Sequence, residues 1–67
     1  MNIEYENGKY RFRVNGSSIQ CKGDELRDNI KKYGIRDFSI VIYSTAKVEI
    51  ERVEEIANNI RLEYKVN

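Results

Sequence analysis

The sequence contains no histidine, proline or tryptophan, and its single cysteine, Cys21, has no second cysteine with which to form an intrachain disulfide. The lack of histidine excludes a Ser-His-Asp triad, and a zinc site needs several Cys or His ligands at set spacings. The four glycines are widely spaced and match no phosphate-binding loop. We therefore expect no catalytic site, no metal site and no cofactor.

Long apolar runs and an excess of one charge are also missing. The longest apolar run, Ile40–Tyr43, is far too short to span a membrane, and residues 1–6 lack the features of a secretion signal. Lys plus Arg number 12 and Asp plus Glu number 11, for a net charge of +1. This balance predicts neither a general nucleic-acid binder nor a membrane-surface binder. The expected location is the cytoplasm.

The length of 67 residues predicts a single domain, 1–67, with a small core. One cysteine, buried as a small hydrophobe, leaves no covalent staple. The many isoleucine and asparagine codons implied by the sequence suggest a low-GC bacterium or its phage as the source.

Alternation of apolar and polar residues predicts three short strands in the first third of the chain, at 3–5, 9–14 and 17–21. Tyr10, Phe12 and Val14 share one face of the second segment. The Asn-Gly pairs at 7–8 and 15–16 favour type I′ turns, because such turns need positive φ at both central positions. The pattern is typical of a β-meander.

Leu26, Ile30 and Tyr33 recur at helical spacing and predict a first helix over about 24–33, with Asp24 as its N-cap. The segment 38–43 is apolar on both faces, which is typical of a central strand that is covered on both sides or nearly so.

A second helix is predicted from the apolar stripe Val48, Ile50, Val53, Ile56 and Ala57. Asn58-Asn59 would end this helix, because asparagine tolerates the left-handed conformation. Residues 60–66 then alternate and predict a last strand, while continuation of the helix through Ile60 and Tyr64 is the alternative.

The predicted fold is an α+β two-layer sandwich of order β-β-β-α-β-α-β, with a mixed sheet and two helices on one face. Its expected core consists of Tyr10, Phe12, Val14, Ile19, Leu26, Ile30, Tyr33, Phe38, Ile40, Ile42, Val53, Ile56, Ile60, Leu62 and Tyr64.

The segments Tyr10–Gly16, Leu26–Ile30, Ile40–Thr45 and Val48–Val53 resemble the hairpin, helix, strand and helix of the periplasmic domain of the biopolymer-transport proteins ExbD and TolR. This resemblance implies a similar fold and a tendency to dimerise. Members of that family also carry an N-terminal membrane helix with an aspartate, and residues 1–67 contain no match to it. A role in a proton-driven motor is therefore not carried over.

Two surfaces are candidate binding sites. Lys9, Arg11 and Arg13 form a basic row, and Val41 and Tyr43 are expected beside it on the sheet face away from the helices. An exposed apolar patch indicates an interface, whereas aromatic and basic groups on a sheet can bind single-stranded nucleic acid. An ordinary solvated strand face is the alternative, with Glu63 expected on it.

The second candidate surface is an acidic helix face that includes Glu51, Glu54 and Glu55, together with Glu49. It could bind a basic partner, although solvated acidic faces are common.

The sequence thus favours a non-enzymatic protein-interaction module. It would bind another protein, or a second copy of itself, through the uncovered sheet face, an edge strand or the acidic helix. Single-stranded nucleic-acid binding through Arg11, Arg13 and Tyr43 is the alternative function.

Overall fold

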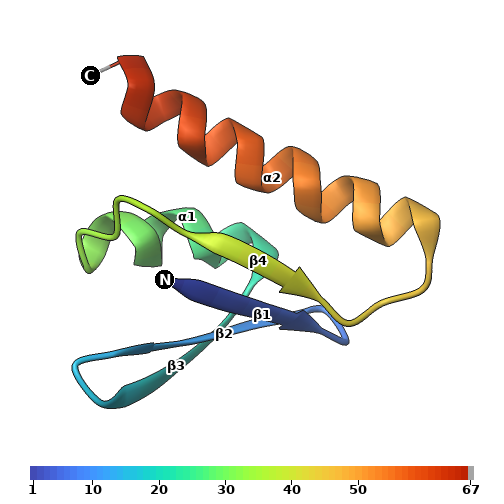
Figure 1. Cartoon of the computed structure of the whole chain (residues 1–67), viewed down its shortest axis with the longest axis horizontal. Coiled ribbons are helices and arrows are strands. Elements are labelled where there is room, and N and C mark those ends of the chain that lie inside the picture. The colour runs from blue at the N-terminus through green and yellow to red at the C-terminus, as the bar shows by residue number, and fades with distance from the viewer. Residues whose placement is uncertain (67) are drawn as a thin grey trace.

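The computed structural model describes the backbone of residues 1–66 and the side chains of residues 1–63. The elements, in chain order, are β1 (Asn2–Glu6), β2 (Lys9–Val14), β3 (Ser17–Lys22), α1 (Gly23–Lys32), β4 (Ser39–Ile42) and α2 (Lys47–Val66) (Figure 1).

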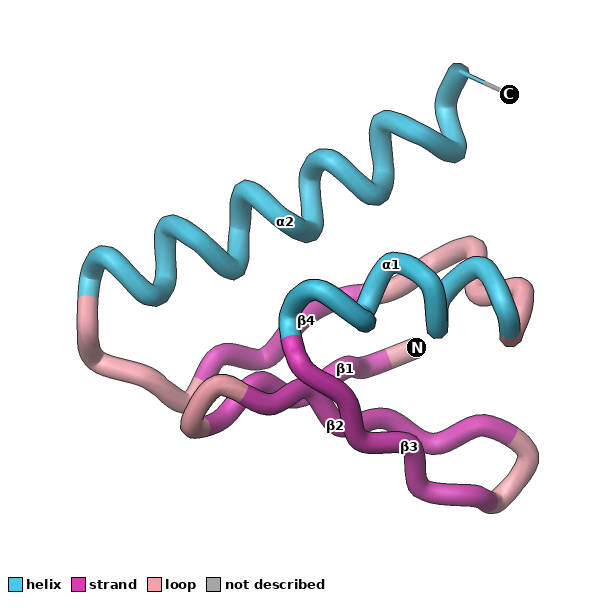
Figure 2. Tube along the Cα trace, turned by 180° about the vertical axis from the view of Figure 1, so that it is seen from behind, coloured by secondary structure: helices cyan, strands magenta, loops and turns pink. Residues whose placement is uncertain are grey.

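The four strands form one mixed sheet in the order β3-β2-β1-β4. β2 is antiparallel to β1 and to β3, whereas β4 is parallel to β1. Both helices lie on the same side of the sheet, where α1 contacts β2 and β3, and α2 contacts β4 and α1 (Figure 2). The predicted α+β two-layer sandwich, with a mixed sheet and two helices on one face, is confirmed.

Both hairpin turns have the predicted geometry. Asn7 and Gly8 have φ values of 51° and 81°, and Asn15 and Gly16 have values of 50° and 82°. Positive φ at both central positions is the mark of a type I′ turn. Two tight turns therefore place β1, β2 and β3 side by side in sequence order.

The start of α1 differs from the prediction. Lys22, and not Asp24, is the N-cap, and its backbone N–H donates a hydrogen bond of 3.0 Å to the Glu25 carboxylate. Asp24 lies in the first turn, where its negative charge interacts favourably with the positive end of the helix dipole. Gly34 follows the helix with a φ of 66°, as predicted for the residue after its end.

β4 is an edge strand, so the prediction of a central strand is wrong. The two hairpins pair β2 with both β1 and β3, so β1 has one side left, and β4 pairs with that side. The face of β4 away from the helices stays open, and the Val41 side chain is 40% exposed. Ile40 and Ile42 pack against the core, so burial within the domain explains the inner apolar face of this strand but not Val41 on its outer face.

The predicted strand over 60–66 is also wrong, because α2 continues through Val66. Ile60 extends the apolar stripe of the helix and is 2% exposed, whereas Leu62 is 57% exposed. Asn58 and Asn59 do not end the helix, and the Asn58 side chain accepts a hydrogen bond from Arg61 one turn later. The residues of this segment fit both a strand alternation and the apolar stripe of a helix, and the structure has the helix.

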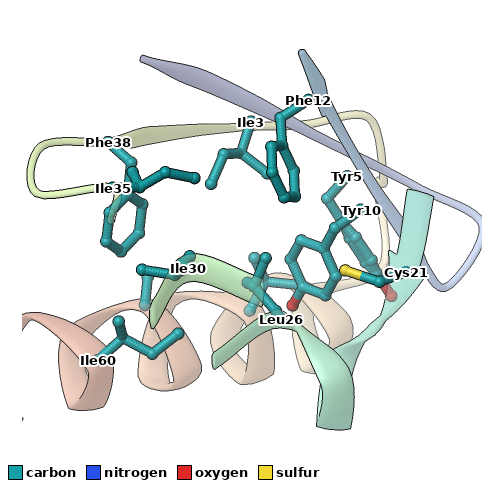
Figure 3. Close-up of a cluster of buried hydrophobic side chains, with 12 residues drawn as sticks. Ile3, Tyr5, Tyr10, Phe12, Cys21, Leu26, Ile30, Ile35, Phe38 and Ile60 are labelled. Carbon is teal, nitrogen blue, oxygen red and sulfur yellow. The ribbon is translucent and has the colours of Figure 1, made fainter. Parts of the chain in front are cut away.

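The core lies between the helices and the inner face of the sheet (Figure 3). Its buried residues are Ile3, Tyr5, Tyr10, Phe12, Cys21, Leu26, Ile30, Ile35, Phe38, Val53, Ala57 and Ile60. Among the residues predicted for the core, those that are only partly buried are Val14, Ile19, Tyr33, Ile40, Ile42 and Ile56.

Leu62, which was predicted for the core, is exposed to solvent instead. Val48, the first residue of the predicted helical stripe, is 69% exposed. The side chain of Tyr64 lies outside the described residues. Ile3 and Tyr5, which the predicted core did not include, are buried because β1 is a central strand.

Candidate protein interface

All five residues of the predicted interaction surface lie on the open face, which is the sheet face opposite the helices. Lys9, Arg11 and Arg13 alternate with the buried residues of β2, and Val41 and Tyr43 alternate with Ile40 and Ile42 at β4. The two groups are not adjacent, because β1 lies between β2 and β4.

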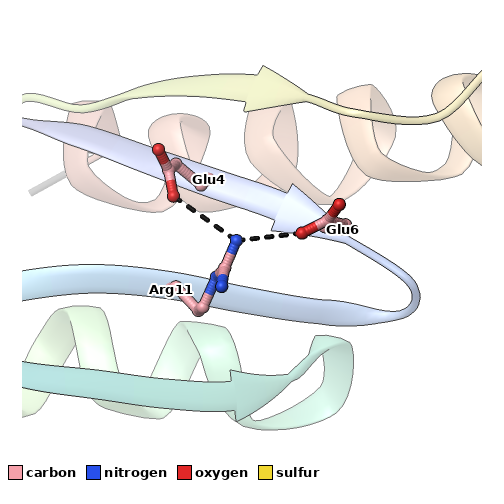
Figure 4. A network of polar contacts seen from close by, with 3 residues as sticks. All are labelled: Glu4, Glu6 and Arg11. Atoms are coloured by element: carbon pink, nitrogen blue, oxygen red, sulfur yellow. Dashed lines mark hydrogen bonds and ion pairs between the residues drawn. The ribbon is translucent and has the colours of Figure 1, made fainter.

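An ion-pair cluster separates the two groups (Figure 4). Arg11 Nη2 lies 3.0 Å from Glu6 Oε1 and 3.6 Å from Glu4 Oε1, and both glutamates are on β1. Glu4 is the cross-strand partner of Arg11. The basic row is therefore compensated by acidic side chains at the centre of the open face.

This cluster could have been found in the sequence. A two-residue turn at Asn7-Gly8 pairs Glu6 with Lys9, and counting back along both strands brings Glu4 opposite Arg11. Glu63, which was expected on this face, instead joins the helices, with Oε1 2.8 Å from Arg27 Nη2 and Oε2 3.6 Å from Lys31 Nζ.

The apolar part of the open face lies at β4. Val41 is 40% exposed and Tyr43 is 55% exposed. In the described part of the chain, no strand lies beyond β4. The backbone N–H groups of Ser39 and Tyr43 donate to the carbonyls of Met1 and Tyr5 on β1. Because alternate residues of a strand direct their backbone groups to opposite edges, those of Ile40 point to the free edge.

A groove of about 230 Å³ runs between this free edge and α2. Residues from both elements line it: Ile40, Ile42, Val53, Glu54, Ala57, Asn58 and Arg61. Arg61 lies at one end, where its guanidinium is 4.7 Å from the centre of the Phe38 ring and donates to the Phe38 carbonyl at 3.1 Å. The two isoleucines are only half-buried because nothing in the described structure fills the groove's outer side.

The acidic helix face is partly as predicted. Glu51, Glu54 and Glu55 are exposed. Glu49 instead turns toward the sheet, where its carboxylate accepts hydrogen bonds from the hydroxyls of Tyr5 and Ser44, the latter at 2.7 Å. These two bonds lower the pKa of Glu49, and the bond to Glu49 raises the pKa of Tyr5.

The contact between Tyr5 and Glu49 also fixes the start of α2. The Ser44 hydroxyl accepts a hydrogen bond of 3.2 Å from the Ala46 N–H, and the same hydroxyl donates to Glu49. One carboxylate thus joins β1, the loop after β4 and the first turn of α2.

The remaining reactive groups are buried or isolated. Burial raises the pKa of the Cys21 thiol, and burial likewise raises the pKa of Tyr10 to about 12, so both side chains stay protonated at neutral pH. Among the described residues, no group of three or more acidic, cysteine or histidine side chains could hold a metal ion. Within residues 1–66, no helix is both long and apolar enough to cross a membrane.

Comparisons with protein-family models, with curated proteins and with solved structures find no match to this chain. The resemblance to the ExbD and TolR periplasmic domains stays a prediction.

Proposed function

We propose that this chain is a protein-interaction module without enzymatic activity, and that it binds another protein along the free edge of β4. The observation that carries this proposal is the combination of an unpaired strand edge with the exposed apolar side chains of Val41 and Tyr43. Exposed apolar groups beside hydrogen-bonding groups without strand partners favour an interface.

The mode of binding that this edge supports is addition of a strand. An extended segment of a partner would form main-chain hydrogen bonds with β4, and its side chains would alternate between the two faces of the sheet. One set would cover Val41 and Tyr43, and the other would enter the groove beside Ile40 and Ile42. Such an addition would bury four apolar side chains that the domain by itself leaves partly exposed.

The electrostatics of the open face oppose the alternative, single-stranded nucleic-acid binding. Phosphates that approached Arg11 would also approach the carboxylates of Glu4 and Glu6, which already pair with this arginine. Binding of an oligonucleotide that weakens steeply with salt would favour the alternative.

Site-specific photo-crosslinking tests the proposed function. A benzophenone amino acid would replace either Tyr43, at the β4 end of the open face, or Gln20, an exposed residue on β3 at the opposite edge. The composition suggests a low-GC bacterium or its phage, so the lysate of such a host is the first medium to use. We expect a discrete crosslinked product from position 43 and none from position 20.

Equal products from both positions, or none from either at high lysate concentration, would contradict binding at β4. The control at position 20 is matched because both residues lie on the open face and both are exposed.

A further inference from the structure

The edge at β4 lies in the longest stretch of the sequence without a charged residue, which runs from Phe38 to Ala46. Native proteins usually protect a free edge strand with charged side chains, proline or a bulge. Neither a charge nor a proline occurs in this stretch. The edge therefore has the composition of a strand that pairs.

The hydrogen-bonding groups available at this edge belong to two residues. Ser39 and Tyr43 face β1 through their N–H groups, so Ile40 and Ile42 face outward. The carbonyl of Phe38 already accepts a hydrogen bond from Arg61. An incoming strand can therefore pair with the outward backbone groups of Ile40 and Ile42.

A second β4 meets this requirement in the antiparallel direction. Centred on Val41, the two strands would place Ile40 of each copy opposite Ile42 of the other, and both residues would exchange hydrogen bonds. The two Val41 side chains would lie opposite each other on the open face. The pairing is self-complementary, as a twofold interface requires.

Helix α2 has a charge pattern that fits the same twofold axis. Glu54, Asn58 and Arg61 recur at i, i+4 and i+7, and all three line the groove beside β4. Arg61 lies at the Phe38 end of this row, and the row runs along the groove that Ile40 and Ile42 also line. An antiparallel second α2 would run in the reverse direction along the same groove, so that its Arg61 would face Glu54 and its Glu54 would face Arg61.

We propose that the partner on the β4 edge is a second copy of this chain, bound antiparallel about Val41, with Glu54 of each copy facing Arg61 of the other. This proposal rests on the proposed function, because it names the protein bound at β4. The result would be one continuous sheet from both copies, with all four helices on one face.

Sedimentation equilibrium of the full chain tests the proposal with a charge-reversal series. We expect a dimer for the parent and, for Glu54→Lys, a dissociation constant raised by about tenfold or more, because each new lysine would face an arginine. The double variant Glu54→Lys with Arg61→Glu restores opposite charges across the axis and should recover the dimer.

Glu55→Lys is the matched control, because this neighbouring glutamate is exposed and does not line the groove. It should leave the dissociation constant unchanged. A parent that stays monomeric up to about 1 mM, the weakest dissociation constant on the usual affinity scale, overturns the proposal. So does an equal effect of Glu55→Lys and Glu54→Lys.

The crosslinking experiment separates this failure from failure of the proposed function. In the dimer, the probe at position 43 gives a product of twice the chain mass with purified protein. If the chain is monomeric and the probe at position 43 captures a different protein, the proposed dimer is overturned but binding at β4 is not. Capture that is equal at positions 43 and 20 overturns binding at β4 itself.

Discussion

The two edge strands of the sheet differ in how they meet solvent. β3 presents Ser18, Gln20 and Lys22 outward, whereas β4 presents Ser39 and Val41, with Tyr43 just beyond. Within the described residues, each of these two strands has a neighbouring strand on one side only. Polar and charged side chains protect one edge from adding a strand, and the other edge has no such protection.

The inner faces of the two edge strands differ less. On β3, Cys21 is 7% exposed and Ile19 is partly buried, while on β4 both Ile40 and Ile42 are partly buried. α1 follows β3 directly and packs on β2 and β3, whereas a groove lies between α2 and β4. The two edges therefore differ mainly in their outward side chains and in this groove.

The largest expected effect compares a central strand with the β4 edge. Ile3 and Ile40 are neighbours in the parallel pairing, but Ile3 is 0% exposed and Ile40 is half-buried. We expect Ile3→Ala to lower the free energy of unfolding by about 2–5 kcal/mol, and Ile40→Ala by less than about 2 kcal/mol in dilute protein. Urea denaturation at low concentration measures both. Equal losses would remove the distinction between the two strands.

The next effect concerns acid stability at the contact that ties α2 to β1. Because the pKa of Glu49 is lower in the folded chain, this carboxylate stabilises the fold above its unfolded pKa, about 4.3. The stabilisation is lost as the pH falls through the lower, folded pKa.

Tyr5→Phe removes the main cause of this shift. We therefore expect the free energy of unfolding of Tyr5→Phe to fall less steeply below pH ~4.3 than that of the parent. Denaturation curves collected across this range compare the two slopes. Identical slopes would show that the bond between Tyr5 and Glu49 does not contribute to acid stability. Tyr43→Phe is the control, because it removes a tyrosine hydroxyl from the open face.

Thiol labelling compares the two edges directly. Cys21 is buried with a raised pKa, so it should react with a maleimide only when the domain opens. Cysteine introduced by Ile42→Cys, in a Cys21→Ala background, should react faster because position 42 is partly exposed at the groove. Mass spectrometry measures both labelling rates. Faster labelling of Cys21 than of the cysteine at position 42 would contradict the expected difference between the two edges.

The smallest expected effect lies at the centre of the open face. The Arg11 side chain is 48% exposed, and its ion pairs with Glu4 and Glu6 are screened by water. We expect Arg11→Ala to change the free energy of unfolding by less than about 1 kcal/mol. A larger loss of unfolding free energy, measured by thermal or urea denaturation, would show that the open face contributes to stability as much as the face packed against the helices.

Local patterns predicted much of the fold. The two Asn-Gly turns and the alternation of Lys9–Val14 were read correctly, because turn geometry and period-two alternation depend on neighbouring residues. The residues of the open face were also placed on one side of the sheet. Their separation by β1 was not foreseen, because strand order depends on contacts between distant segments.

The errors share one cause, which is that a pattern can fit two structures. Residues 60–66 alternate like a strand, yet Ile60 also continues the helical stripe of α2, and its burial in the core, at 2% exposure, favours the helix. Similarly, apolar residues on both faces of β4 fit either a buried central strand or an edge that binds a partner.

The sequence by itself determined the hairpins, the first helix, the α+β class and the lack of a histidine-based or disulfide-based site, since these follow from local geometry and composition. Only the tertiary structure decided that β4 lies at an edge, that Arg11 is paired with two glutamates, and that Glu54 and Arg61 share a groove. These features arise where segments far apart in the chain meet, and their relative positions depend on the packing of the whole domain.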